Sequence, residues 1–288
     1  MVMLVGIVVA SLLLAACAGP AGPAGPAGAP GPAGPPGAAG VRGSDGAPGK
    51  AGPAGERGPA GPAGAAGVAA VAGKAPAADI LAHSGRLYDS WVSELKATNP
   101  TGEQPLWATQ TTNKNTGGTT WRCKECHGWD YKGKNGAYGK GSHLTGFTGV
   151  INGAAAQSRE QLLGIMSGAN DYRHDFSKLL GDLHTGHIVD FLKYGMVNLT
   201  PHIDYATKKA IGSNVAEGKK AYDGACAACH GADGRTLKFG SAQEVVGTIA
   251  VDNPWEFVHK VRFGQPNSAM PSGVVNGWSM QQVVDVLG

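Results

Sequence analysis

Apolar residues recur at helical spacing in two segments of the chain. Near the C-terminus a helix is predicted to begin close to Trp278, and its apolar positions are Val283, Val284 and Leu287. About a hundred residues earlier, a second segment carries Ile188, Val189, Phe191 and Leu192. Apolar positions three and four residues apart fall on one face of an α-helix. Both segments are therefore predicted to be helices that pack against a core.

The chain starts with a short apolar run, MVMLVGIVVASLLLAAC. About thirteen apolar residues are too few to span a bilayer and match the central region of a signal peptide better. The ending Leu14-Ala15-Ala16-Cys17 resembles a bacterial lipobox, whose Cys is diacylated and becomes the first residue of the mature protein. We therefore predict a lipoprotein signal peptide over residues 1–17 with lipidation at Cys17. The alternative is an apolar leader with an incidental Cys, and the run departs from the usual pattern because no Lys or Arg precedes it.

Glycine then occupies every third position from Gly19 to Gly67, seventeen times without a miss. The tract also holds 11 of the 18 prolines of the chain. A strict Gly-x-y period with this much Pro is typical of collagen, in which three polyproline II chains leave room only for Gly at the axis. Residues 18–75 are predicted to form a collagen-like stalk that makes the protein a homotrimer. At about 3.1 Å per residue, the Gly-x-y tract of residues 19–69 would extend up to roughly 160 Å. The alternative is a monomeric spacer of the same composition.

The rest of the chain has an ordinary composition. Residues 76–288 contain enough apolar residues to bury a core, and the formal net charge of the whole chain is only +3. No long run of like charges appears, so the charge balance gives no argument for nucleic-acid binding. We therefore expect globular domains after the collagen-like segment.

Four of the five cysteines occur in two C-x-x-C-H motifs, and the fifth is the cysteine of the leader. The motifs are Cys123, Cys126, His127 and Cys226, Cys229, His230. Two thiols at this spacing can add to the two vinyl groups of one haem, and the adjacent His then becomes the proximal iron ligand. Zinc sites pair their C-x-x-C units about 15–20 residues apart, whereas these motifs lie about a hundred residues apart. The sequence thus predicts two covalently bound haem c groups and leaves no cysteine for a disulfide or a thiol nucleophile.

Both motifs lie in segments that resemble class I cytochrome c domains. In such a domain a helix with an aromatic residue precedes the haem motif, and a closing helix packs across it. Here Tyr88 and Tyr222 precede the motifs, in the stretches GRLYD and EGKKAYD. The resemblance covers roughly residues 80–197 and 214–288. It implies a dihaem c-type cytochrome of the all-α class, with tandem haem domains at residues 76–200 and 201–288 behind the extended collagen-like region.

The first domain departs from the pattern by about thirty additional residues between Tyr88 and Cys123. Three tryptophans belong to this part of the chain, namely Trp91, Trp107 and Trp121. Two interpretations stay open. The indoles cover the haem edge or the seam between the domains, or they are ordinary core residues.

The sixth ligand of the second iron follows from the resemblance. In class I domains it is usually a Met on the loop before the closing helix. The stretch KVRFGQPNSAMPSG places Met270 forty residues after His230 and directly before Pro271. This context is similar to the Met-Pro ligand loop of the family and implies Met270 as the distal ligand.

The first domain has no Met-Pro pair. Its stretch GIMSGANDYRHDFS aligns with that of the second domain through a helix-ending glycine, Gly168 in one and Gly264 in the other. Six residues after each glycine come His174 and Met270. We therefore predict a bis-His first haem with His127 and His174 as iron ligands. The alternatives for the distal ligand are His143, His184, His187 and Met166.

These ligand sets predict electron transfer. A Met ligand in place of His raises the haem potential, so the first haem is expected to have the lower potential and the second the higher. Two six-coordinate irons leave no open position for a substrate, which favours an electron carrier over an enzyme. Basic side chains near the first motif form either a docking rim for an acidic redox partner or merely a solvated loop: Arg122, Lys124, Lys132, Lys134 and Lys140.

Two enzymatic functions are alternatives to the carrier. Dihaem cytochrome c peroxidases also pair a bis-His haem with a His/Met haem, and their distal His leaves so that peroxide can bind. A thiosulfate-dehydrogenase-like enzyme needs a Cys ligand, and no Cys is free.

The residues after Cys17 lack the Asp that retains lipoproteins in the inner membrane. We therefore expect an exported protein that is lipid-anchored to the outer membrane, faces the periplasm or the cell surface and exchanges electrons with partner proteins.

Overall fold

The structure, a computed structural model, describes residues 75–288, which lie within one compact unit. The predicted signal peptide, the lipidation site Cys17 and residues 18–74 of the collagen-like segment lie outside the described residues. The α-helices are α1 (Ala78–Glu94), α2 (Cys123–His127), α3 (Ile151–Ala156), α4 (Arg159–Met166), α5 (Ser177–Asp190), α6 (Val215–Ala225), α7 (Ala227–His230), α8 (Val246–Asp252), α9 (Pro254–Phe263) and α10 (Met280–Leu287). Short 3₁₀ segments are η1 (Trp107–Thr109), η2 (Gly117–Trp121), η3 (Ala137–Gly139), η4 (Gly141–His143) and η5 (Tyr172–His174), and a π-helical turn, η6 (Phe191–Gly195), follows α5.

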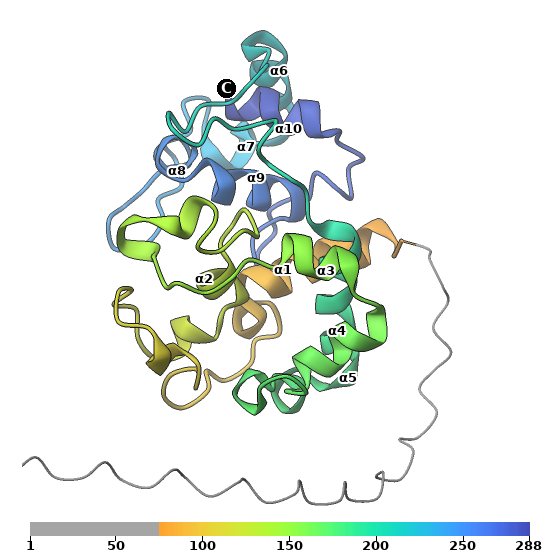
Figure 1. The fold of residues 1–288 in the computed structure, drawn as a ribbon. Coiled ribbons are helices and arrows are strands. Elements are labelled where there is room, and N and C mark those ends of the chain that lie inside the picture. The colour runs from red at the N-terminus through yellow and green to blue at the C-terminus, as the bar shows by residue number, and fades with distance from the viewer. Residues whose placement is uncertain (1–74) are drawn as a thin grey trace, which may run out of the picture. The chain divides into compact units, whose positions relative to one another are not determined.

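The described part of the chain is helical and contains only isolated β-bridges instead of strands, as the predicted all-α class requires. Figure 1 shows α2 to α5 in the lower part of the unit and α6 to α10 in the upper part, with α1 crossing between them. Among residues 75–288, none of the helices has the length and apolar character needed to cross a bilayer.

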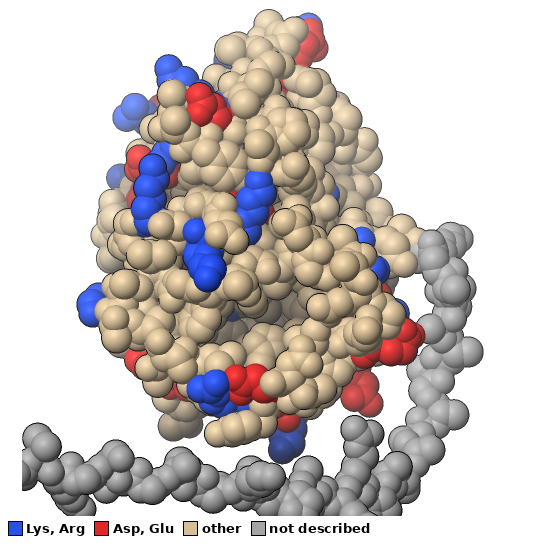
Figure 2. Space-filling view, in the orientation of Figure 1, with Lys and Arg blue, Asp and Glu red and all other residues tan. Residues whose placement is uncertain are grey.

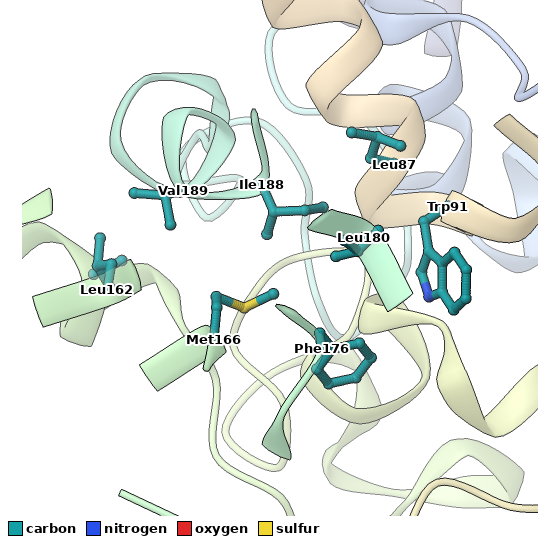
Figure 3. Packing of buried hydrophobic residues seen from close by; sticks show 9 residues of the cluster. Leu87, Trp91, Leu162, Met166, Phe176, Leu180, Ile188 and Val189 are labelled. Atoms are coloured by element: carbon teal, nitrogen blue, oxygen red, sulfur yellow. The ribbon is translucent and has the colours of Figure 1, made fainter. Parts of the chain in front are cut away.

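The core of the N-terminal region (residues 76–200) lies between α1, α4 and α5. Figure 3 shows Leu87 and Trp91 from α1 directed toward Leu180 and Ile188 from α5, with Met166 from α4 on the other side. The segment with Ile188 and Val189 is helical as predicted, and both side chains are buried. The packed apolar face of α5 thus fixes the loop that precedes it, which carries His174.

The C-terminal region (residues 201–288) brings α6 and α10 together across its surface. Gly218 of α6 has no Cβ, and a Cβ there would overlap the carbonyl oxygen of Asp285, so the glycine permits this close crossing. The closing helix α10 begins at Met280 rather than at Trp278, because Ser279 and Gln282 form a capping box around its first turn. Val283 and Val284 are buried as the helical spacing predicted.

An aromatic cluster joins the two regions between α1 and α9. Its members are Tyr88, Tyr131, Phe191, His259 and Phe263. His259 is fully buried; its Nε2–H donates to the carbonyl of Gly85 at 2.9 Å, and the Tyr131 hydroxyl lies 2.9 Å from its Nδ1. A Cβ on Gly85 would overlap the Phe263 ring. The helices therefore approach so closely that only glycine fits at this point of α1.

Beside this cluster a buried carboxylate connects three elements. Asp89 of α1 is 0% exposed, forms an ion pair with Arg122, and accepts a hydrogen bond from Lys260 Nζ of α9 at 2.7 Å. Burial alone would raise the pKa of Asp89, but the charges of Lys260 and Arg122 outweigh it and lower the pKa to about 2. The carboxylate is therefore ionised. It connects Arg122, the residue before Cys123, and Lys260 of α9 to α1.

Candidate functional site

The first C-x-x-C-H motif forms α2, a single helical turn that brings its three side chains to one side. Gly128 ends the turn with φ of 79°, a conformation that residues with a Cβ rarely adopt. The hydroxyl of Tyr88 donates to the Gly128 carbonyl at 2.7 Å. The aromatic residue that precedes the motif in the sequence therefore fastens the motif to α1.

The His127 imidazole is oriented by the backbone. Its Nδ1 lies 2.8 Å from the carbonyl oxygen of Thr148, an acceptor, so this nitrogen carries the proton and Nε2 remains available as a ligand. Burial lowers the pKa of His127 to about 4. The ring is thus neutral near pH 7, the form in which an imidazole binds a metal.

His174, in η5, faces His127. The two ring centres are 6.3 Å apart and the ring planes are inclined by 70°. An iron atom bound on both sides by imidazole nitrogens at about 2 Å requires ring centres roughly 6 Å apart. His174 Nδ1 lies 3.3 Å from the carbonyl of Ile165, which again leaves Nε2 as the available nitrogen. Both rings therefore offer the same atom to the space between them.

That space is a cavity of about 420 Å³. Cys123, Cys126, His127 and His174 all line it, together with apolar side chains such as Leu162 and Ile188. Figure 2 shows the hollow on the face seen there, between the segments that carry α2 and α4. None of the four described cysteines forms a disulfide, so both thiols of the motif are available for thioether bonds. The residues present therefore fit a covalently attached haem, which Cys123 and Cys126 would hold through thioether bonds and which His127 and His174 would ligate.

None of the other candidates for this position has its ring or thioether in a recorded contact with the ring of His127. His143 stacks on Tyr138, with ring centres 4.6 Å apart. Met166 contributes to the cavity wall but is part of the buried core beside α5. His184 and His187 project from α5 and contact the ring of His83. Of the predicted set, the structure brings His174 opposite His127.

The second motif repeats the local geometry of the first. Tyr222 of α6 donates to the carbonyl of Gly231 at 2.8 Å, as Tyr88 does to Gly128. Gly231 ends the turn with φ of 82°. Beyond each turn, the carbonyl of the motif His accepts a backbone hydrogen bond, at 2.8 Å from Gly133 in the first motif and at 2.9 Å from Thr236 in the second. The two turns therefore share the left-handed glycine and these two hydrogen bonds.

Cys226 lies at the junction of α6 and α7, and Cys229 and His230 follow in α7. The Nδ1 of His230 is buried without a hydrogen-bond partner among the described residues. Met270 is half-buried in the loop between α9 and α10, where its backbone N–H donates to Ser268 Oγ at 3.2 Å. The hydrogen bonds and ring contacts of the described residues do not link Met270 to His230. The structure thus assembles the first predicted ligand set more completely than the second.

The helix-ending glycines used for the alignment occupy equivalent places. Gly168 follows α4 with φ of 81°, and Gly264 follows α9 with φ of 85°. A Cβ on Gly264 would lie 2.8 Å from the carbonyl oxygen of Met270. The glycine therefore lets the Met270 loop fold back onto the end of α9.

Two of the five basic side chains near the first motif are engaged within the protein. Lys124 is buried and forms an ion pair with Glu125, and Arg122 is bound to Asp89. Lys134 and Lys140 are exposed, and the ammonium group of Lys132 lies over the ring of Tyr205. Lys124 and Arg122 thus anchor the motif, and Lys134 and Lys140 are the exposed members of the set.

The tryptophans divide between the two interpretations. Trp91 is a core residue whose Nε1–H donates to the Trp121 carbonyl at 3.0 Å. The ring of Trp107 packs against Phe147 and that of Trp121 against Phe176. Both phenylalanines line the cavity. Trp107 and Trp121 therefore support the cavity wall from behind.

Sequence reasoning missed the residues that hold the motifs in place. The sequence identifies the tyrosine before each motif but not its hydrogen bond to the glycine after the motif. The signal that could have indicated this bond is the recurrence of Tyr before and Gly after both motifs. The carbonyl of Thr148 carried no signal because any residue could supply it.

Two protein-family models match parts of the chain. Residues 213–287 match the family model described as cytochrome C oxidase, cbb3-type, subunit III. Residues 17–77 match the collagen triple helix repeat (20 copies). Searches of curated proteins and of solved structures found no match. The chain therefore contains a cytochrome c domain, which implies covalently bound haem c, and a collagen-like repeat region, as the sequence predicted.

Proposed function

We propose that the protein is an exported dihaem c-type cytochrome whose function is electron transfer. The first haem would be held by Cys123, Cys126, His127 and His174, and the second by Cys226, Cys229, His230 and Met270. The observation that carries the proposal is the opposed His127 and His174 pair over the cysteines of α2. The family match supports the second site, and the repeated Tyr-to-Gly hydrogen bond supports a second copy of the same turn.

The chemistry that haem c supplies is reversible one-electron exchange, and the residues of the chain set how strongly each site holds the electron. A second imidazole stabilises the ferric form, so His174 favours a low potential at the first site. The thioether of Met270 favours the ferrous form and a higher potential at the second. Cys123 and His127 line the cavity together with apolar side chains such as Leu162 and Ile188, which make the surroundings of the first site less polar.

A potentiometric titration of the full holoprotein tests this proposal. We expect two one-electron waves per chain, a weak long-wavelength iron–thioether band from Met270, and two haems per chain by haem content. Met270→His should remove that band and lower the potential of the upper wave while leaving the lower wave in place, because imidazole replaces the thioether at one site only. A single wave with one haem per chain would overturn the dihaem proposal, and a wild-type protein without the band would overturn the Met270 assignment.

Peroxide chemistry is the second candidate function. It is favoured by the position of His174 in a short 3₁₀ segment beside Tyr172, whose side chain is 83% exposed, because such a segment could swing away. With two six-coordinate sites we expect the half-reduced holoprotein to be oxidised by hydrogen peroxide slowly and without saturation. A fast, saturable oxidation measured by stopped-flow absorbance would establish the enzyme instead.

The collagen-like region is proposed to trimerise the protein and to hold its haem domains away from a lipid anchor at Cys17, at the outer membrane. We expect the full chain to sediment as a trimer. Gly37→Ala with Gly40→Ala should reduce it to a monomer, because only Gly fits at the triple-helix axis. The matched control, Ala38→Ser with Ala39→Ser, keeps the glycine phase and should remain trimeric. A monomeric wild-type chain in analytical ultracentrifugation would contradict the stalk.

A further inference from the structure

Three histidines meet on the packed faces of α1 and α5: His83, His184 and His187, called here the three-histidine cluster. Each offers one ring nitrogen, and these nitrogens all lie within 4.8 Å of one another. The ring centres of His83 are 5.6 Å from His184 and 5.2 Å from His187, and the two α5 rings are 5.7 Å apart. The rings are tilted or edge-on rather than stacked, so their nitrogens converge on a common point.

The fold produces this convergence from two helices. His184 and His187 are three residues apart on α5, a spacing that places both side chains on one helix face. Helix α1 packs along α5 and brings His83 to that face. The cluster is separate from the candidate haem site, because none of its three side chains lines the cavity there, whereas Ile188, next to His187, does.

A carboxylate fixes the orientation of one imidazole. His83 Nδ1 lies 2.7 Å from Glu94 Oε1, so Nδ1–H donates and Nε2 is the nitrogen of His83 that can bind. These residues are eleven apart in α1, which in a straight helix would separate them by about 16 Å along the axis. The non-helical backbone of Ser90, with φ −156° and ψ 91°, kinks the helix and returns Glu94 to His83.

The same carboxylate is held by other groups. Arg86 Nε donates to Glu94 Oε1 at 2.8 Å, and the backbone N–H of Asn267 donates to Oε2 at 3.1 Å. Metal-binding histidines usually donate their second N–H to a carboxylate in this way, which fixes the ring and strengthens the ligand. Glu94 thus has the position of such a supporting carboxylate, and it reaches the loop that contains Met270.

The two histidines of α5 each have a ring nitrogen without a hydrogen-bond partner in the described part of the chain. The Nδ1 atoms of His184 and His187 are buried and have no hydrogen-bond partner among the described residues. A buried polar atom without a hydrogen-bond partner makes the folded state less stable, so each such atom needs an explanation. An ion at the centre of the cluster would fix the rings and their tautomers, as ligation does in known metal sites.

We propose that His83, His184 and His187 bind one divalent transition-metal ion of the zinc class, separate from the haem iron. Imidazole nitrogens suit zinc, copper and nickel, and three histidines with one position left to water form a common zinc coordination. The half-buried side chains leave the ion a path to solvent. The bound ion would pin α1 to α5 and, through Glu94, stiffen the contact with Asn267.

Zinc titration of the untagged, full-chain holoprotein tests the proposal. Equilibrium dialysis followed by elemental analysis should find one zinc ion per chain in addition to the haem iron, and zinc should raise the temperature of unfolding. The variant with His184→Gln and His187→Gln, which keeps the side-chain volumes similar, should lose this zinc. The matched control His202→Ala removes a histidine outside the cluster and should retain it.

Glu94→Gln separates a metal site from a merely structural cluster. The substitution keeps a hydrogen-bond partner for His83 but removes the charge, and it should weaken zinc binding by about 10- to 100-fold. The proposal is overturned if the wild-type holoprotein takes up no zinc, or if the His184→Gln, His187→Gln variant still binds it. Haem absorption and helical circular dichroism verify that each variant is folded. If the double variant fails that check, the single His187→Gln variant decides the question in the same assay.

Discussion

The His174→Ala holoprotein is expected to bind carbon monoxide at one haem per chain within the mixing time, whereas the unaltered reduced holoprotein binds none on that timescale. The reason is geometric. His174 presents its ring 6.3 Å from that of His127 across the cavity, with Nε2 available because Nδ1 is engaged by the Ile165 carbonyl. An Ala at this position leaves one side of the site without a ligand.

Carbon monoxide difference spectra of the reduced protein measure this effect directly. His143→Ala is the matched control, because His143 stacks on Tyr138 away from His127, and it should leave carbon monoxide binding absent. If the His174→Ala protein stays inert while the control binds, His143 is the ligand and the assignment fails. A gain of iron–thioether absorption in the variant would instead show that Met166, which lines the cavity wall, has moved into the vacated place.

Replacing Asp89 by Asn should reduce the free energy of unfolding by about 3–5 kcal/mol, because removing one partner of a buried ion pair leaves the others unpaired. Asp89 has no exposed surface and binds both Arg122 and Lys260. Asp223→Asn is the control, since Asp223 pairs with Lys219 in an exposed position, where such pairs contribute at most about 1 kcal/mol. Urea unfolding of the holoproteins, followed by helical circular dichroism, compares them.

The same carboxylate predicts a pH dependence. The pKa of Asp89 in the folded protein, about 2, lies below its ordinary value of 3.8. The unfolded chain therefore binds the proton more readily, and the stability from Asp89 is present above about pH 4 and is lost as the pH falls toward 2. The Asp89→Asn protein should lack this part of the acid sensitivity. Equal slopes for both proteins between pH 4 and 2 would contradict the ion-pair role.

The sequence predicts the parts of this structure that depend on local spacing. The apolar positions of α5 and α10 identify those helices, and Gly168 and Gly264 mark the ends of the preceding ones, because left-handed backbone favours glycine. The count of six residues from each glycine then leads to His174. The repeated motif pattern likewise identifies α2 and α7 as equivalent turns.

What the sequence does not predict depends on residues far apart in the chain. Lysine is a residue type that usually lies at the surface. The ammonium group of Lys124 is nevertheless buried, where it pairs with Glu125 and lies over the Trp129 ring. Glu94 and His83 would be distant in a regular helix, and only the kink at Ser90 makes them neighbours. Asp89 acquires one of its two partners, Lys260, from α9, 171 residues later. Periodicity specifies which face of a helix is buried, but not which segment covers it.

The contact of Gly85 with Phe263 indicates whether the two regions of the protein can fold separately. Although the chain resembles two successive cytochrome domains, α1 buries Leu87 and Trp91 against α5 and receives Phe263 and His259 from α9 on another side. A fragment cut out at residue 201 would present that phenylalanine and that histidine to water. We therefore expect that the matched stretch 213–287 does not fold by itself and that residues 75–288 unfold in a single cooperative step.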